Sequence, residues 1–201
     1  LGCLGDYDSP YLTLLPEFEA REIHCFSEMA LKGLIYKGLK PVYWSPSSES
    51  ALAEAEIEYH DVKAYTIFVT LDVTNGKDVL PNDAKCVIWT TTPWTLPANL
   101  AVCAHPDFYY GLYDTNLGKL VFLTDLKDHL VETLNLTKCE LIKEFKGSEL
   151  EYIKLKHPFY DRESLLINGE YVTKDSGTGL VHIAPGHGED DYNVCLKYNI
   201  K

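Results

Sequence analysis

The chain has 201 residues, of which 46% are hydrophobic and 12% aromatic, so it holds enough apolar material for one packed domain with a lead-in segment. Its formal net charge of -12 argues against a general nucleic-acid binder, which would carry a basic surface patch. No apolar run reaches the length of a membrane span and no signal peptide is visible, so we expect no membrane partner.

The six cysteines give no sign of a metal or redox site. None belongs to a C-x-x-C pair, and several lie in apolar stretches, where a free cysteine behaves as a small hydrophobe. They stand at positions 3, 25, 86, 103, 139 and 195. This usage predicts a reducing, cytoplasmic location, with an organelle left open. Because residue 1 is Leu rather than Met, we expect a piece excised from a longer chain.

Residues 1–45 are expected to form a lead-in segment with one helix. Apolar residues repeat at spacings of three and four from Pro16 to Lys37, which predicts a helix with one apolar face. Gly38 is a suitable stop signal for that helix. The Pro- and Ser-rich residues 39–50 are expected to be a loop.

Residues 53–59 carry two conflicting signals. Their Ala and Glu residues are good helix formers, whereas apolar residues alternate with glutamates in the way of a half-exposed strand. We expect a strand, because that arrangement places Glu54, Glu56 and Glu58 together on one solvent face.

The domain at residues 46–201 is expected to be rich in strands. Helices are expected at 125–134, capped by Asp125, and from Glu189 through Tyr198. The expected strands cover residues 65–73, 86–89, 100–104, 108–113, 119–123, 139–145, 152–155, 165–172 and 180–184. Many short strands with frequent turn signals predict a barrel or closed sheet. The fold class is therefore α+β, with a strand-rich β-barrel core and peripheral helices.

The first stretch with chemical character is V-I-W-T-T-T-P-W-T-L-P-A-N at residues 87–99. Three consecutive threonines favour an extended backbone, and Pro93 should end the strand because it cannot donate a ladder hydrogen bond. The stretch then presents hydroxyl groups and the indole of Trp94, which suits the floor of a pocket for a small polar ligand. The simpler interpretation is a Thr-rich edge strand with Trp94 in the core.

The second such stretch is G-T-G-L-V-H-I-A-P-G-H-G-E-D-D-Y at residues 177–192. In the simplest interpretation Asp190 and Asp191 compensate a helix dipole and His182 is a core histidine. A second interpretation makes His182, His187 and one of the two aspartates a metal site. In the third, one carboxylate with a lowered pKa at the helix start holds an ammonium group.

Both stretches closely resemble the editing domain inserted into isoleucyl-tRNA synthetases. The segment P-V-Y-W-S-P-S-S-E-S-A-L-A-E-A-E-I-E-Y at 41–59 resembles the part of those synthetases that leads into that domain. The resemblance implies hydrolysis of mischarged valyl-tRNA(Ile), with valyl-adenylate as a further substrate. The implied partners are the acceptor end of tRNA(Ile) carrying valine and the rest of a parent synthetase. The alternatives that we keep are a non-catalytic docking module for the acceptor end and a purely structural insertion.

The resemblance also implies roles for single residues. Those assigned to catalysis are Thr90, Thr91, Thr92, Asn99 and Asp191. The threonines would bind the terminal adenosine and position water, and Asp191 would hold the α-ammonium group of the substrate.

Four further residues are assigned to substrate binding, namely Trp94, His182, Asp190 and His187. By the resemblance, His182 would line the side-chain pocket and exclude isoleucine, and Trp94 would form the wall beside the adenosine. Asp190 is a weaker candidate than Asp191 for the ammonium group.

Two departures limit the chemistry. Some family members carry a zinc-binding C-x-x-C pair where this chain has Ser45 and Ser48, so we expect no zinc there and no cofactor. The nucleotide-binding motifs of the synthesis site are also missing from these 201 residues, so we expect no amino-acid activation by this chain.

Overall fold

The computed structural model describes residues 2 and 4–200, so the expectation for Cys3 lies outside the described residues. The chain divides into two units, Leu1–Leu39 and Lys40–Lys201, whereas the sequence suggested a boundary after residue 45. No helix in the described part of the chain is both long enough and apolar enough to span a membrane. The described cysteines are free thiols.

The first unit contains α1 (Pro16–Leu31), which ends earlier than the sequence suggested. Gly33 takes a left-handed φ of +71°, its N–H donates to the Ala30 carbonyl, and the Leu34 N–H donates to the Met29 carbonyl. This pairing ends the helix at a glycine, so Gly33 and not Gly38 is the stop signal. In the described structure none of the side chains of α1 is buried.

The second unit begins with a two-stranded ribbon, β1 (Trp44–Ser45) paired with β2 (Ser50–Ala51). A short 3₁₀ turn, η1 (Glu54–Glu56), follows, and the strand expected at 53–59 is wrong. The Glu56 carboxylate accepts a hydrogen bond from the Ala53 N–H at 2.7 Å, a local bond that favours the turn over an extended backbone.

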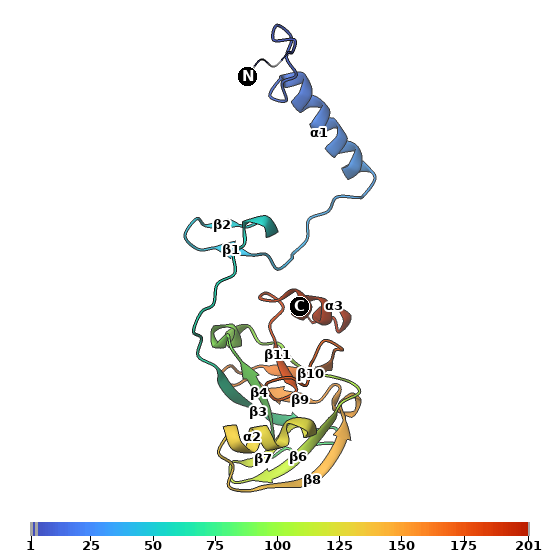
Figure 1. The fold of residues 1–201 in the computed structure, drawn as a ribbon. Coiled ribbons are helices and arrows are strands. Elements are labelled where there is room, and N and C mark those ends of the chain that lie inside the picture. Colours follow the sequence, from blue (N-terminus) through green and yellow to red (C-terminus); the bar gives the residue numbers. More distant parts are fainter. Residues whose placement is uncertain (1, 3, 201) are drawn as a thin grey trace. The chain divides into compact units, whose positions relative to one another are not determined.

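Within residues 4–200, nine strands form one mixed sheet in the order β11-β5-β10-β9-β3-β4-β7-β6-β8 (Figure 1). They are β3 (Ile67–Asn75), β4 (Ala84–Thr90), β5 (Ala101–Ala104), β6 (Tyr109–Thr115), β7 (Gly118–Leu123), β8 (Cys139–Lys146), β9 (Lys154–Lys156), β10 (Glu163–Asn168) and β11 (Leu180–Ile183). Most expected strands are confirmed, including the antiparallel hairpin of β6 and β7. The expected strand at 165–172 stops at Asn168.

The sheet curls without closing. β11 pairs with β5 and also lies against β4, which stands four places beyond β5 in the strand order. In the described residues no pairing joins the end strands β11 and β8, so the α+β class is confirmed and the closed barrel is not. The curl matters for function, because it brings the end of β4 and the strand β11 together although they are about 90 positions apart.

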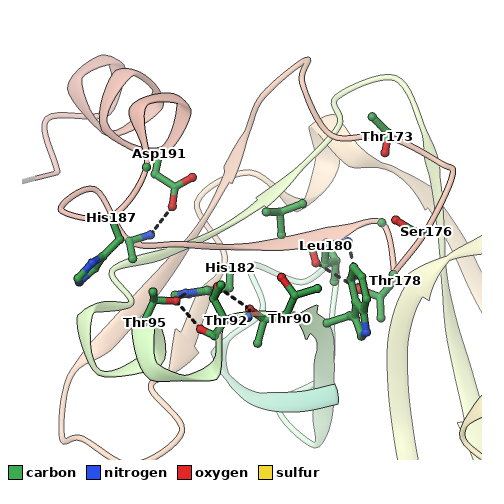
Figure 2. A pocket seen from close by; sticks show the side chains of 17 residues that line it. Thr90, Thr92, Thr95, Thr173, Ser176, Thr178, Leu180, His182, His187 and Asp191 are labelled. Atoms are coloured by element: carbon green, nitrogen blue, oxygen red, sulfur yellow. Dashed lines mark hydrogen bonds between the residues drawn. The ribbon is translucent and has the colours of Figure 1, made fainter. Parts of the chain in front are cut away.

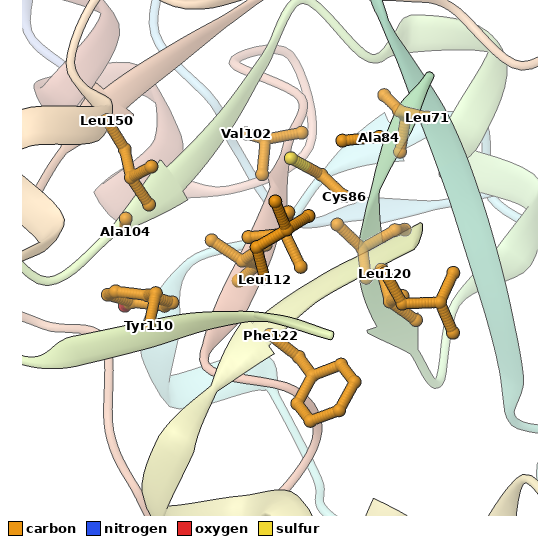
Figure 3. Close-up of a cluster of buried hydrophobic side chains, with 14 of the residues drawn as sticks. Leu71, Ala84, Cys86, Val102, Ala104, Tyr110, Leu112, Leu120, Phe122 and Leu150 are labelled. Atoms are coloured by element: carbon orange, nitrogen blue, oxygen red, sulfur yellow. The ribbon is translucent and has the colours of Figure 1, made fainter. Parts of the chain in front are cut away.

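Two apolar clusters pack against the sheet. The larger contains Tyr110, Leu120 and Phe122 (Figure 3). The helix α2 (Lys127–Thr133) contributes Leu130 to it. The smaller packs α3 (Glu189–Lys197) on β5, β10 and β11 through Val194 and Cys195. Both helices are confirmed, but Asp125 does not cap α2; it lies in the 3₁₀ turn η3 (Thr124–Leu126) and pairs with Lys174.

Two more 3₁₀ turns complete the fold. η4 (Gly147–Leu150) follows β8, and η2 (Pro93–Ala98) follows β4. Trp94 on η2 is 69% exposed, so the interpretation that places it in the core is wrong. The turn η2 begins where the consecutive threonines end, and it carries side chains of the site described next.

Candidate functional site

A cavity of about 330 Å³ lies where β4, η2, β11 and the start of α3 meet. This volume is at the small end of the range for ligand pockets. Figure 2 shows Asp191 and His187 at one end of the cavity, Thr173 and Ser176 at the other, and His182 between them. The lining residues are Trp89, Thr90, Thr91, Thr92, Thr95, Thr173, Ser176, Gly177, Thr178, Gly179, Leu180, Val181, His182, Ala184, His187, Gly188 and Asp191.

The three threonines line the cavity where β4 ends. Thr90 is buried, Thr92 is half-buried and Thr91 is exposed. The Thr92 N–H donates to Thr90 Oγ1 at 3.1 Å, and the two hydroxyl oxygens lie 3.3 Å apart. The backbone therefore bends at Pro93 as the sequence predicts, and the bend turns polar atoms towards the cavity.

His182 is held from both sides of its ring. The Asn99 amide nitrogen lies 2.9 Å from Nδ1, and Thr95 Oγ1 lies 2.8 Å from Nε2. The same Asn99 nitrogen donates to the Ala101 carbonyl at 2.8 Å, which identifies it as the NH₂ group. His182 Nδ1 is therefore an acceptor, and the ring proton is on Nε2 and donated to Thr95. The Thr95 hydroxyl in turn donates to the Thr92 carbonyl at 2.8 Å.

Burial keeps His182 neutral at physiological pH. Burial lowers the pKa of His182 to about 4, with smaller contributions from His157 and His187. At neutral pH the ring has no free lone pair, because Nδ1 already accepts from Asn99. His182 is thus a shaped, uncharged wall and cannot take a proton from water without breaking the contact with Asn99.

Asp191 lies in the first turn of α3 and reaches back to the loop after β11. Its Oδ2 accepts a hydrogen bond from the Ala184 N–H at 2.7 Å. Burial raises the pKa of Asp191, and this outweighs the lowering by that hydrogen bond. The expected lowered pKa is therefore wrong, because the carboxylate is half-buried in a cavity that desolvates it. A cation in the cavity would stabilise the ionised form.

The G-T-G segment forms a further wall of the cavity. Gly177 and Gly179 both take a left-handed φ of +76°. A Cβ at Gly179 would lie 2.4 Å from the Leu123 Cβ, so only glycine fits there. The Thr178 carbonyl accepts from the Leu123 N–H at 2.9 Å, and the Gly179 carbonyl accepts from the Tyr110 hydroxyl at 2.7 Å. These contacts fix the wall to the large apolar cluster.

Three of the residues that the sequence singled out do not line the cavity. Asn99 is 1% exposed and acts through its contact with His182, and Trp94 is largely exposed and is not among the lining residues. Asp190 is exposed and borders a separate concavity with Tyr171 and Lys197. The sequence interpretation did not assign Thr95 or Thr178, although both stand inside the quoted motifs.

The metal interpretation finds no support in the geometry. The described residues contain no group of three or more His, Cys, Asp or Glu side chains placed to hold a metal ion. Both ring nitrogens of His182 are already engaged by Asn99 and Thr95, so neither is available as a ligand.

Comparison with known proteins gives a family match over most of the chain. Residues 1–183 match the model of the tRNA synthetases class I (I, L, M and V). The chain is 59% identical over 202 residues to the isoleucine–tRNA ligase of Staphylococcus saprophyticus, with all of this chain and 22% of that protein covered. It is 57% identical over 200 residues to that of Lactococcus lactis. The chain thus spans about a fifth of the length of these relatives.

Solved structures show a shared fold over about two thirds of the chain. The crystal structure of GlLeuRS-CP1 is similar with a TM-score of 0.55 at 19% identity, over 68% of this chain and 66% of that chain. The editing domain of the P. knowlesi cytosolic leucyl-tRNA synthetase is similar with a TM-score of 0.55 at 12% identity, over 71% and 69%. At such low identity these likenesses concern the fold alone.

Proposed function

The chain belongs to the tRNA synthetases class I (I, L, M and V), and on that premise we propose that its cavity hydrolyses valine from mischarged valyl-tRNA(Ile). The observation that carries the proposal is the cavity of about 330 Å³ that joins the Thr90–Thr92 bend to His182 and Asp191. A carboxylate, an uncharged wall and a row of hydroxyls match the ammonium, side chain and ribose of an aminoacyl ester.

Such a site meets a physical need. The pocket that selects isoleucine for activation in a synthetase cannot strongly reject valine, which lacks one methylene group. The discrimination is roughly 150-fold, a known figure for isoleucyl-tRNA synthetases and not one obtained from this structure. A second pocket, too small for isoleucine, removes the valine that escapes the first selection.

Asp191 anchors the substrate by its α-ammonium group. Its carboxylate is half-buried and keeps one oxygen on the Ala184 N–H, so its direction is fixed before the substrate arrives. An incoming ammonium replaces the lost solvation, which lowers the pKa of Asp191 and strengthens the ion pair.

His182 limits the size of the substrate side chain. The ring is 8% exposed, and its two hydrogen bonds prevent it from turning aside. A valine side chain is accepted, whereas the additional methylene of isoleucine would need a displacement of this wall. A rigid, neutral ring serves this purpose better than a charged one, because it presents a surface of low polarity without drawing water into the cavity.

The reaction is attack by water on the ester carbonyl. A carbon–oxygen bond forms from water, the ester bond to the ribose oxygen breaks, and one proton passes to that oxygen, which gives valine and uncharged tRNA. The hydroxyls and backbone of Thr90, Thr91 and Thr92 position the water and the terminal adenosine. His182 does not act as the base, because its pKa is near 4 and Nδ1 is occupied.

The acceptor end reaches the cavity with help from elsewhere in a parent synthetase. The formal net charge of -12 gives this chain little attraction for tRNA phosphates. We assign most phosphate contacts to the remainder of such a synthetase, and the terminal nucleotide to the cavity.

A non-hydrolysable analogue tests the site directly. A valyl-adenosine analogue with an amide in place of the ester should shift the backbone NMR signals of Thr90–Thr92, His182 and Asp191. The isoleucyl analogue at the same concentration should leave them nearly unchanged. If neither analogue shifts these signals, or if both shift them equally, the proposed second sieve is wrong.

A further inference from the structure

The turn η2 is a proline-containing segment that receives hydrogen bonds from side chains elsewhere in the chain. It is a 3₁₀ turn of six residues with prolines at positions 93 and 97, so two of its backbone nitrogens have no hydrogen to donate. At its two ends, the Thr95 N–H donates to the Thr92 carbonyl and the Asn99 N–H donates to the Leu96 carbonyl. Yet it places Thr95 and leads into Asn99, the two side chains that hold His182.

His157 supports this turn from outside the cavity. It follows β9, is 1% exposed, and its Nε2 lies 2.9 Å from the Leu96 carbonyl oxygen. The Arg162 guanidinium donates to the next carbonyl, that of Pro97. Two consecutive carbonyls of η2 are therefore held by side chains at the two ends of the loop between β9 and β10.

The ring of His157 bridges two backbone segments in one tautomer. Its Nδ1 lies 3.3 Å from the Phe159 nitrogen and 3.1 Å from the Tyr160 nitrogen, and both of these are N–H donors. Nδ1 is thus an acceptor, and the proton on Nε2 is donated to Leu96. Tyr160 stacks on the ring with a centroid distance of 5.0 Å and fixes its plane.

We propose that His157 is a positioning residue for the size limit of the cavity, acting through η2 on the Thr95 and Asn99 contacts to His182. The expected effect on the discrimination of valine from isoleucine rests on the proposed function. His157 itself is not among the cavity-lining residues and touches no substrate.

Two substitutions separate the two ends of the bridge. In His157→Asn the short amide can still accept from the Phe159 and Tyr160 N–H groups, but it does not reach Leu96. In His157→Gln the longer amide can donate to the Leu96 carbonyl, while the turn at 159–160 loses its acceptor. The Asn variant thus releases η2, and the Gln variant keeps it.

The first readout needs no turnover. Ring nitrogen NMR of His182 should show a single Nε2–H tautomer in the wild-type chain and in His157→Gln, and a mixed or shifted signal in His157→Asn. The second readout is the ratio of kcat/KM for valyl over isoleucyl ester. This ratio should fall by about tenfold in His157→Asn, which is the scale of one lost hydrogen bond, and stay within about threefold in His157→Gln.

Unchanged His182 signals in folded His157→Asn, or equal shifts in both variants, would overturn the proposal and leave His157 a general fold contact. If His157→Asn does not fold, His157→Ser replaces it, because its hydroxyl can accept from the same two N–H groups and does not reach Leu96; unchanged His182 signals there likewise overturn the proposal. If the signals shift as expected while the wild-type chain cleaves neither ester, the positioning role holds and the proposed function alone fails.

Discussion

Replacing Asp191 by Asn separates its charge from its shape. The amide oxygen can still accept from the Ala184 N–H, so the local backbone should not move. The substrate ammonium loses a charged partner, which is worth about 1.5–3 kcal/mol. Because each 1.4 kcal/mol is tenfold, kcat/KM for valyl-tRNA should fall by roughly 10- to 150-fold.

The same substitution should not weaken the fold. Burial raises the pKa of Asp191 above its ordinary value of 3.8, so the folded chain binds a proton more tightly than the unfolded chain. Between the ordinary and the raised pKa, stability from this group therefore falls as pH rises. Asn removes that fall, and we expect the melting temperature at neutral pH to be equal or higher. Substrate binding by the wild type should weaken as pH drops through the raised pKa.

The assay is deacylation of valyl-tRNA across pH, beside thermal unfolding. Glu189→Gln is the matched control, because it removes one charge from the same helix start at an exposed position outside the cavity lining. It should act as the wild type. Wild-type kcat/KM in Asp191→Asn would refute the ammonium anchor, and a selective loss in Asp190→Asn would move that anchor to Asp190.

His182→Ala should let isoleucyl-tRNA be hydrolysed, and an intact isoleucyl ester beside cleaved valyl ester would remove His182 as the size limit. Thr95→Val leaves the Nε2–H of His182 without an acceptor, so unfolding free energy measured in denaturant should fall by about 1–3 kcal/mol. Gly179→Ala should lower the free energy of unfolding by about 1–3 kcal/mol, because the added Cβ would overlap Leu123. Gly186→Ala is the control, because no atom lies within 4 Å of its added Cβ, and it should unfold like the wild type. Similar melting curves for the two variants would contradict this expectation.

Local patterning predicted the elements that owe their form to nearby residues. The hairpin of β6 and β7 follows alternation and a turn at Gly118, whose φ is +102°. The strand expected at 53–59 failed for a local reason as well, since Glu56 bonds back to Ala53 and no partner strand is present among the described residues. The sequence could not predict whether the sheet closes into a barrel, because closure depends on whether the two end strands pair with each other.

The site was predictable in its motifs and not in its contacts. Both Thr90–Thr92 and His182 were singled out from sequence, and the curl of the sheet brings them to one cavity. The bond of His182 to Thr95 joins residues 87 positions apart, so no spacing rule could reveal it. The raised pKa of Asp191 was missed for the same reason, because burial is set by tertiary packing and not by the helix start.

The most direct measurement is deacylation of valyl-tRNA(Ile) and isoleucyl-tRNA(Ile) by this chain, each compared with its spontaneous hydrolysis. We expect the valyl ester to be cleaved faster than it decays alone and the isoleucyl ester to decay at its spontaneous rate. Equal cleavage of both esters, or saturable binding of the valyl analogue with no acceleration of either, would contradict a selective hydrolytic site.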